Sequence, residues 1–151
     1  MTGFIDPTRE AMAAFRDLPA DQPIAMINLV RFLETATYPT DHPDHAAART
    51  GAEAYAAYGR AAAAPFARSG GSQIWLGRPE LTLIGPADEA WDLAFIVRYE
   101  TAESFIAMVR DPEYQLAVVH RQAAVADSRL IRCQPRVAGS GFGFGEGQGT
   151  H

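Results

Sequence analysis

The sequence predicts an α+β protein with a ferredoxin-like βαββαβ sandwich, in which helices cover one face of a four-stranded antiparallel sheet. Apolar patterns typical of strand, helix, strand, strand, helix and strand follow one another over residues 22–134, after an added N-terminal helix. Glycine, proline and capping residues separate these patterns. A chain of 151 residues with 48% hydrophobic content is also the right size for one domain with a proper core.

The N-terminal helix is expected over residues 7–18, because Asp6 followed by Pro7 is typical of a helix start and an apolar stripe follows. Residues 24–32, IAMINLVRF, are rich in apolar and β-branched side chains. Such a short run predicts a strand with apolar residues on both faces.

The first helix of the core begins with a capping box formed by Thr50 and Glu53 and is expected to run to about Ser69, where a glycine pair ends it. A strand over residues 73–84, interrupted by Gly-Arg-Pro, should follow. Residues 91–99, WDLAFIVRY, alternate on one face and are mostly apolar on the other, so they predict the next strand.

The second helix is expected in two parts, over residues 101–109 and 111–126, because an Asp-Pro pair restarts it. Residues 128–133 predict the last strand. The single domain should therefore end near residue 135. Residues 136–151 are rich in glycine and poor in apolar side chains, which predicts a flexible tail.

The sheet is expected to carry a subunit interface. Two helices can cover only one of its faces, yet the strands at 24–32 and 91–99 are apolar on both. The second face should meet another sheet, most simply that of an identical subunit. The sequence therefore predicts a homodimer that pairs through the sheet face.

Composition excludes several functions. The net charge of −5 and the lack of a basic patch argue against nucleic acid as a partner, and no signal peptide or membrane-length apolar run occurs, so a cytoplasmic protein is expected. The single cysteine, Cys133, excludes an intrachain disulfide. All 13 basic residues are arginine, which excludes lysine chemistry. No Rossmann or Walker motif is present, and we expect no cofactor such as NAD, ATP or flavin.

Arg121 is the main candidate for a functional residue, because it lies near the middle of the apolar face of the second helix. A guanidinium there needs a partner. One interpretation is an internal ion pair or hydrogen-bond cluster, with Asp92 or Asp127 as the acid. The other is a bound carboxylate or enolate oxygen, which the planar donors of arginine fit well.

Five further residues are candidates. Asn28 lies mid-strand, where its amide needs a hydrogen-bond partner or a ligand. Tyr55 and Tyr58 share a helix face and, with Tyr114, either pack in the core or surround a ligand cleft. His120 is the best general acid–base by titration range, although a surface or packing role is the alternative.

The loop sequence DHPDH, residues 41–45, offers two imidazoles and two carboxylates, but it lacks a scaffold that would fix them. We interpret it as a solvated loop in which Asp44 caps the following turn, and we expect no metal.

Several segments together resemble one known family. They are NLVRF (28–32), GAEAYAAYGR (51–60), MVRDPEY (108–114) and HRQAAVADSRLI (120–131). In order and spacing they are similar to domain-of-unknown-function family 1330, within the dimeric α/β-barrel superfamily. The resemblance implies a ferredoxin-like subunit that pairs through its sheet into a barrel-like dimer. It implies no particular reaction.

The functional hypothesis is a small cofactor-independent enzyme that acts on an apolar molecule with an anionic or enolisable oxygen. Arg121 and Asn28 would position that oxygen, and His120 or a tyrosine would move a proton. The alternatives are a noncatalytic ligand-binding or stress-related dimer, and a purely structural oligomerisation module. Both ligand hypotheses require a cavity beside Arg121, and the sequence does not decide whether the protein is an enzyme.

Overall fold

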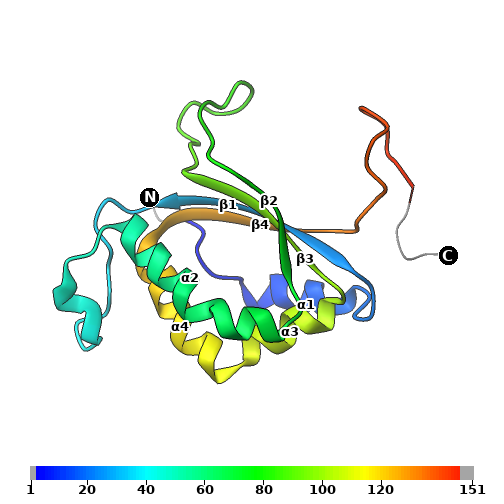
Figure 1. Cartoon of the computed structure of the whole chain (residues 1–151). Coiled ribbons are helices and arrows are strands. Elements are labelled where there is room, and N and C mark those ends of the chain that lie inside the picture. Colours follow the sequence, from blue (N-terminus) through cyan, green and yellow to red (C-terminus); the bar gives the residue numbers. More distant parts are fainter. Residues whose placement is uncertain (1–2, 147–151) are drawn as a thin grey trace.

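The computed structural model describes residues 3–146 and has the predicted βαββαβ order after an N-terminal helix (Figure 1). The elements are α1 (Arg9–Asp17), β1 (Ile24–Phe32), the short 3-10 helix η1 (Pro43–Ala47), α2 (Gly51–Arg68), β2 (Ser72–Gly77), β3 (Leu93–Tyr99), α3 (Ala102–Arg110), α4 (Pro112–Ala124) and β4 (Val125–Cys133).

The four strands form one antiparallel sheet in the order β2-β3-β1-β4. The two central strands of the sheet, β1 and β3, pair directly with each other. All four α-helices lie on the same side of the sheet, while its other face is open (Figure 1). This arrangement confirms the predicted ferredoxin-like sandwich.

Local sequence signals start the two main helices. Thr50 and Glu53 form both hydrogen bonds of the capping box at the start of α2. Asp111 caps α4 by accepting from the backbone N–H of Glu113, with Pro112 in the first turn. These caps satisfy backbone donors that a helix leaves free at its N-terminus.

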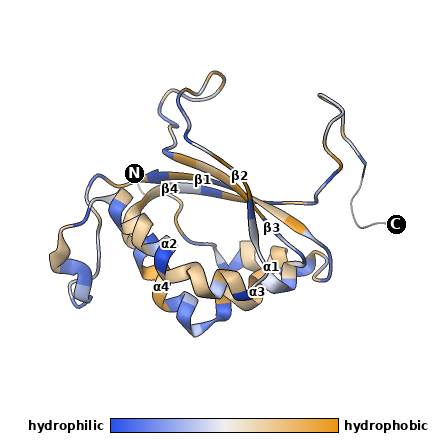
Figure 2. Ribbon diagram, in the orientation of Figure 1, coloured by the Kyte–Doolittle hydropathy of each residue, from blue (hydrophilic) through white to orange (hydrophobic). Residues whose placement is uncertain are grey.

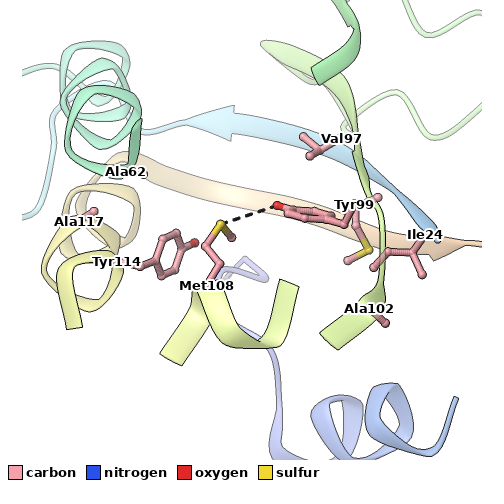
Figure 3. Close-up of a cluster of buried hydrophobic side chains, with 9 residues drawn as sticks. Ile24, Ala62, Val97, Tyr99, Ala102, Met108, Tyr114 and Ala117 are labelled. Atoms are coloured by element: carbon pink, nitrogen blue, oxygen red, sulfur yellow. Dashed lines mark hydrogen bonds between the residues drawn. The ribbon is translucent and has the colours of Figure 1, made fainter. Parts of the chain in front are cut away.

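The core lies between the helices and the sheet. One cluster joins β1, β3, α3 and α4, and Figure 3 shows Tyr99, Met108 and Tyr114 pointing into the same region. The Tyr99 hydroxyl donates to the sulfur of Met108 at 3.9 Å. A second buried cluster forms around Val30 of β1 and Val125 of β4.

Two expected strand boundaries are wrong by three residues or more. The strand expected over 73–84 ends at Gly77, and residues 78–92 form an arm that extends beyond the sheet (Figure 2). Leu83 and Ile84 in this arm are almost fully exposed, because no strand lies beside them to pair with. The last strand begins at Val125 rather than 128, because Val125 already pairs with Phe32 of β1.

The open face of the sheet carries an apolar row that crosses all four strands. Ile27 of β1 is paired with Ile96 of β3 on one side and Ile131 of β4 on the other, and Ile96 is paired with Trp75 of β2. Trp75 is 54% exposed and Ile131 is 48% exposed. The prediction that both faces of the central strands are apolar therefore holds in the structure.

No helix within residues 3–146 has the length and apolarity that crossing a membrane requires. The expected flexible tail falls partly outside the described residues, since 147–151 are not among them. Its described part, residues 136–146, contains no helix or strand, and Phe142 and Phe144 are exposed.

Candidate functional site

A cavity of about 1110 Å³ lies between the helix-covered face of the sheet, α2, α4 and the N-terminal segment. Small-molecule sites in proteins commonly enclose roughly 300–1,000 Å³, so this space is large enough for such a ligand. Most of its lining side chains are apolar, and they include Met26, Phe95 and Val97 of the central strands. Five of the six predicted site residues line it: Asn28, Tyr55, Tyr58, Tyr114 and Arg121.

Arg121 connects α4 to the N-terminal segment across the cavity wall. Its guanidinium donates to the backbone carbonyl of Ile5 at 2.5 Å and to the hydroxyl of Ser128 at 3.2 Å. Both acceptors are neutral. Because a guanidinium has five N–H donors, its remaining donors are available to a ligand.

Neither of the acids that the sequence suggested pairs with Arg121. Asp127 instead pairs with Arg129 at 2.8 Å and accepts from the backbone N–H of Phe4. Asp92 accepts from the backbone N–H of Phe32 at 2.8 Å. Arg121 has no carboxylate partner within residues 3–146, so none of the described acids neutralises its positive charge.

The three tyrosines form a chain of aromatic contacts along the same wall. Tyr55 and Tyr58 are adjacent, and the hydroxyls of Tyr58 and Tyr114 are hydrogen-bonded at 2.8 Å. Burial raises the pKa of Tyr55 to about 12, and the nearby charge of Arg121 only partly opposes this. Burial and the neighbouring Tyr114 raise the pKa of Tyr58 well above its ordinary value. Tyr55 and Tyr58 therefore keep their protons at neutral pH and act as donors, not as bases.

Asn28 faces the cavity from the middle of β1, between Phe95 and Leu130 on the neighbouring strands. Its amide nitrogen donates to the backbone carbonyl of Met26 at 3.2 Å. No donor among the described residues pairs with its side-chain oxygen. The amide can therefore accept a hydrogen bond from a ligand hydroxyl.

His120 does not line the cavity, although it is adjacent to Arg121 in sequence. Its Nδ1 lies 2.6 Å from the hydroxyl of Tyr38, in the connection between β1 and α2. Asp44 lies 3.7 Å away, and Arg49 bridges Tyr38 and Asp44. The structure thus separates His120 from the other five candidates.

The DHPDH loop is also arranged differently from the expectation. His42, not Asp44, caps η1, because its Nδ1 accepts from the backbone N–H of Asp44 at 3.0 Å. Asp44 forms an ion pair with Arg49 at 2.9 Å.

Sequence reasoning missed several polar residues of the cavity wall, among them Ser128 and Arg132 of β4. Arg132 stacks on Phe15 and donates to the backbone carbonyls of Phe15 and Pro19. It therefore holds α1 over the cavity. Arg132 was visible in the sequence, but its partner Phe15 lies 117 residues away along the chain, so no local pattern could indicate the contact.

Comparison with known proteins identifies similar sequences and structures. The family described as Domain of unknown function (DUF1330) matches residues 45–133. A protein of unknown function from Rhodopseudomonas palustris, RPA0582, is 52% identical over 91% of this chain and all of its own, with a TM-score of 0.83. The crystal structure of methylated RPA0582 gives 51% identity, 93% and 100% coverage, and a TM-score of 0.85. Among curated proteins, none matches the chain.

Proposed function

The chain belongs to the family described as Domain of unknown function (DUF1330), and we propose that this member binds a small, largely apolar molecule that carries an anionic oxygen. One observation carries the proposal: Arg121 places a positive charge in the wall of an apolar cavity, and no carboxylate of the described residues pairs with it. A planar guanidinium recognises a carboxylate or enolate through paired hydrogen bonds.

Other lining groups fit the same ligand. The hydroxyls of Tyr55 and Tyr58 stay protonated and can donate to oxygen. The apolar side chains of the sheet, among them Phe95, would contact the body of the molecule. An aromatic or alicyclic carboxylic acid combines these properties, and it is the ligand class we propose.

Binding is better supported than acid–base catalysis. The described residues that line the cavity include no histidine, and their one carboxylate, Asp6, accepts hydrogen bonds from Gln122. A proton-transfer step needs a base within hydrogen-bond reach of the substrate. An enzyme acting here would therefore depend on the bound molecule or on water for that base.

The test compares each acid with its neutral amide. Matched pairs such as an aromatic carboxylate and its carboxamide are titrated into the parent and into Arg121→Leu, with calorimetry as the readout. The parent should prefer the acid by at least about tenfold, since hydrogen bonds to charged groups contribute about 1.5–3 kcal/mol. The Arg121→Leu variant should lose this preference.

Arg110→Leu is the matched control, because Arg110 is exposed on α3 and does not line the cavity. It should keep the parent's preference. Equal acid-over-amide preference in Arg121→Leu and the parent would contradict the anion site. Consumption of a bound acid, followed by mass spectrometry, would instead favour the enzyme hypothesis.

We also propose that the open face of the sheet pairs with a second copy of the chain. Ile27, Ile96, Ile131 and Trp75 form a continuous apolar row there, and an identical row on a second subunit would complement it across a twofold axis. Nearby, the arm at residues 78–92 exposes further large apolar side chains.

Light scattering coupled to size exclusion tests this pairing. Ile131→Glu places a charge in the apolar row and should convert a dimer into a monomer. Leu116→Glu is the control, because Leu116 is 75% exposed on α4, on the helical side. A parent protein that elutes as a monomer, or an Ile131→Glu variant that stays dimeric, would contradict the proposal.

A further inference from the structure

Outside the cavity, three side chains that commonly bind metals come together from two distant parts of the chain. His42 and Asp44 belong to the connection between β1 and α2, and His120 belongs to α4. One potential ligand atom from each residue lies within 4.8 Å of the other two. Nδ1 of His120 and Oδ2 of Asp44 lie 3.7 Å apart.

These separations are close to those of a metal site. Two ligands of a tetrahedral zinc ion stand about 3.4 Å apart when each bond is about 2.1 Å long. His120 and Asp44 already approach this separation. His42 is half-buried beside them, and its ring must shift toward the other two ligands to complete the set.

The neighbouring groups hold the three side chains in place. The ring of His42 stacks on Tyr38 with centroids 5.0 Å apart, and the ring of His120 meets both rings edge-on. The hydroxyl of Tyr38 lies 2.6 Å from Nδ1 of His120. An ion bound to Nδ1 would take the place of this hydroxyl.

Arg49 is the group that opposes a cation. Its guanidinium donates to Oδ2 of Asp44 at 2.9 Å and to the hydroxyl of Tyr38 at 3.1 Å. A carboxylate has two oxygens, and metal-binding carboxylates are usually hydrogen-bonded by a second group. Because Oδ2 is also the oxygen that faces His120, an ion would bind Oδ1 after a turn of the Asp44 carboxylate, while Arg49 stays on Oδ2.

Binding of an ion by His42 would also disrupt the hydrogen bond by which His42 caps η1. A neutral imidazole bound to an ion through one nitrogen carries its proton on the other, so Nδ1 cannot both accept from Asp44 and leave Nε2 for the ion. Losing such a cap costs far less free energy than a structural zinc site contributes to the stability of a small domain.

We propose that His42, Asp44 and His120 bind a divalent transition-metal ion, for which zinc is the best match to two imidazoles and one carboxylate. Three protein ligands leave a fourth position for water. The ion would fix the connection between β1 and α2 to α4. This inference does not depend on the proposed ligand of the cavity.

Calorimetric titration of the full-length, chelator-treated protein with zinc chloride tests the proposal, with His42→Ala, His120→Ala and His45→Ala beside the parent. His45 is the matched control, because it lies in the same connection but outside the cluster, with its ring near the backbone oxygen of Tyr38. The parent and His45→Ala should bind one ion per chain. Replacing His42 or His120 should weaken binding by at least about tenfold.

Cobalt(II) gives a second readout, because ligation by imidazoles and a carboxylate in a four-coordinate site intensifies its visible absorption. The spectrum should appear in the parent and in His45→Ala and be lost in His42→Ala. If His120→Ala fails to fold, the result for His42→Ala alone tests the site, because His42 is in a surface connection whose replacement should not unfold the protein. Absence of zinc binding by the parent, or binding that survives His42→Ala unchanged, overturns the proposal.

Discussion

Arg121 and Ile5 are joined by a hydrogen bond of 2.5 Å from the guanidinium to the backbone carbonyl, across a sequence separation of 116 residues. This contact anchors the N-terminal segment beside the cavity. Ser128 supports it by donating to the backbone carbonyl of Phe4 at 2.7 Å. The α1 helix that follows has no fully buried residue. Its Phe15 packs against Phe105 at the edge of the core, and polar contacts of this kind add to that attachment.

Arg121→Leu should therefore loosen the N-terminal segment as well as weaken anion binding. Trypsin cleavage after Arg9 and Arg16, both on α1, should become faster, because local opening exposes these sites. Stability should fall by about 1–3 kcal/mol, since a charged hydrogen-bond donor is lost. Timed digestion with mass spectrometry and urea unfolding measure the two effects. Unchanged cleavage rates would show that Arg121 does not hold the segment.

The hydrogen bond between Tyr58 and Tyr114 should couple α2 to α4. Removal of one hydroxyl, in Tyr58→Phe or Tyr114→Phe, should cost about 0.5–1.5 kcal/mol, and the double variant should cost much less than the sum. Urea unfolding of the four proteins gives the coupling energy. Tyr55→Phe is the control, because its hydroxyl has no hydrogen-bond partner among the described residues. Strict additivity of the two losses would contradict the coupling.

The fold could be predicted because its signals are local. The capping box at Thr50 and the Asp-Pro pair at residue 111 mark helix starts by backbone chemistry alone. The end of α4 carries no such signal. The chain passes from Ala124 into β4 without glycine or proline, because Val125 pairs with β1 and that tertiary contact sets the boundary.

The candidate site was only partly predictable, for a related reason. Helical periodicity placed Arg121 on the inner face of α4 correctly. It could not supply the partners of Arg121, which come from the N-terminal segment and β4. His120 was chosen for its titration range, but it is the neighbour of Arg121 on α4, and successive residues of a helix point about 100° apart. That rotation is enough to direct it to Tyr38 instead.

Asp111 should make stability depend on pH. Hydrogen bonding from Arg68 and from the backbone N–H of Glu113 holds the pKa of Asp111 below its ordinary value. A carboxyl whose pKa is lower in the folded state stabilises the fold above its unfolded pKa of about 3.9. This contribution is lost as the pH falls through the lower, folded pKa.

Asp111→Asn keeps a side chain that can cap α4 but removes the charge. It should be less stable than the parent at pH 7, and the difference should shrink as the pH falls below about 4. Urea unfolding across this range measures the trend. Asp17→Asn, at an exposed aspartate of α1, should show no comparable change. A stability difference that stayed constant with pH would rule out the charge interaction.

Replacing Gly51 or Gly59, both in α2, by alanine should change the stability of the protein in opposite directions. A Cβ at Gly51 would overlap the carbonyl oxygen of Leu33, to which the N–H of Gly51 donates at 3.1 Å. Because that oxygen belongs to the backbone leading out of β1, it cannot move aside cheaply, and Gly51→Ala should cost about 1–3 kcal/mol. A Cβ at the exposed Gly59 would meet open space.

Gly59→Ala should stabilise the protein by up to about 1 kcal/mol, because alanine loses less conformational entropy than glycine within a helix. The two variants change the same atoms in the same helix, so helix propensity alone would give them the same sign. Thermal and urea unfolding of both proteins beside the parent measure the difference. If Gly51→Ala stabilised the protein, the start of α2 at Thr50 and Gly51 could not lie in close contact with the backbone of Leu33, just after β1.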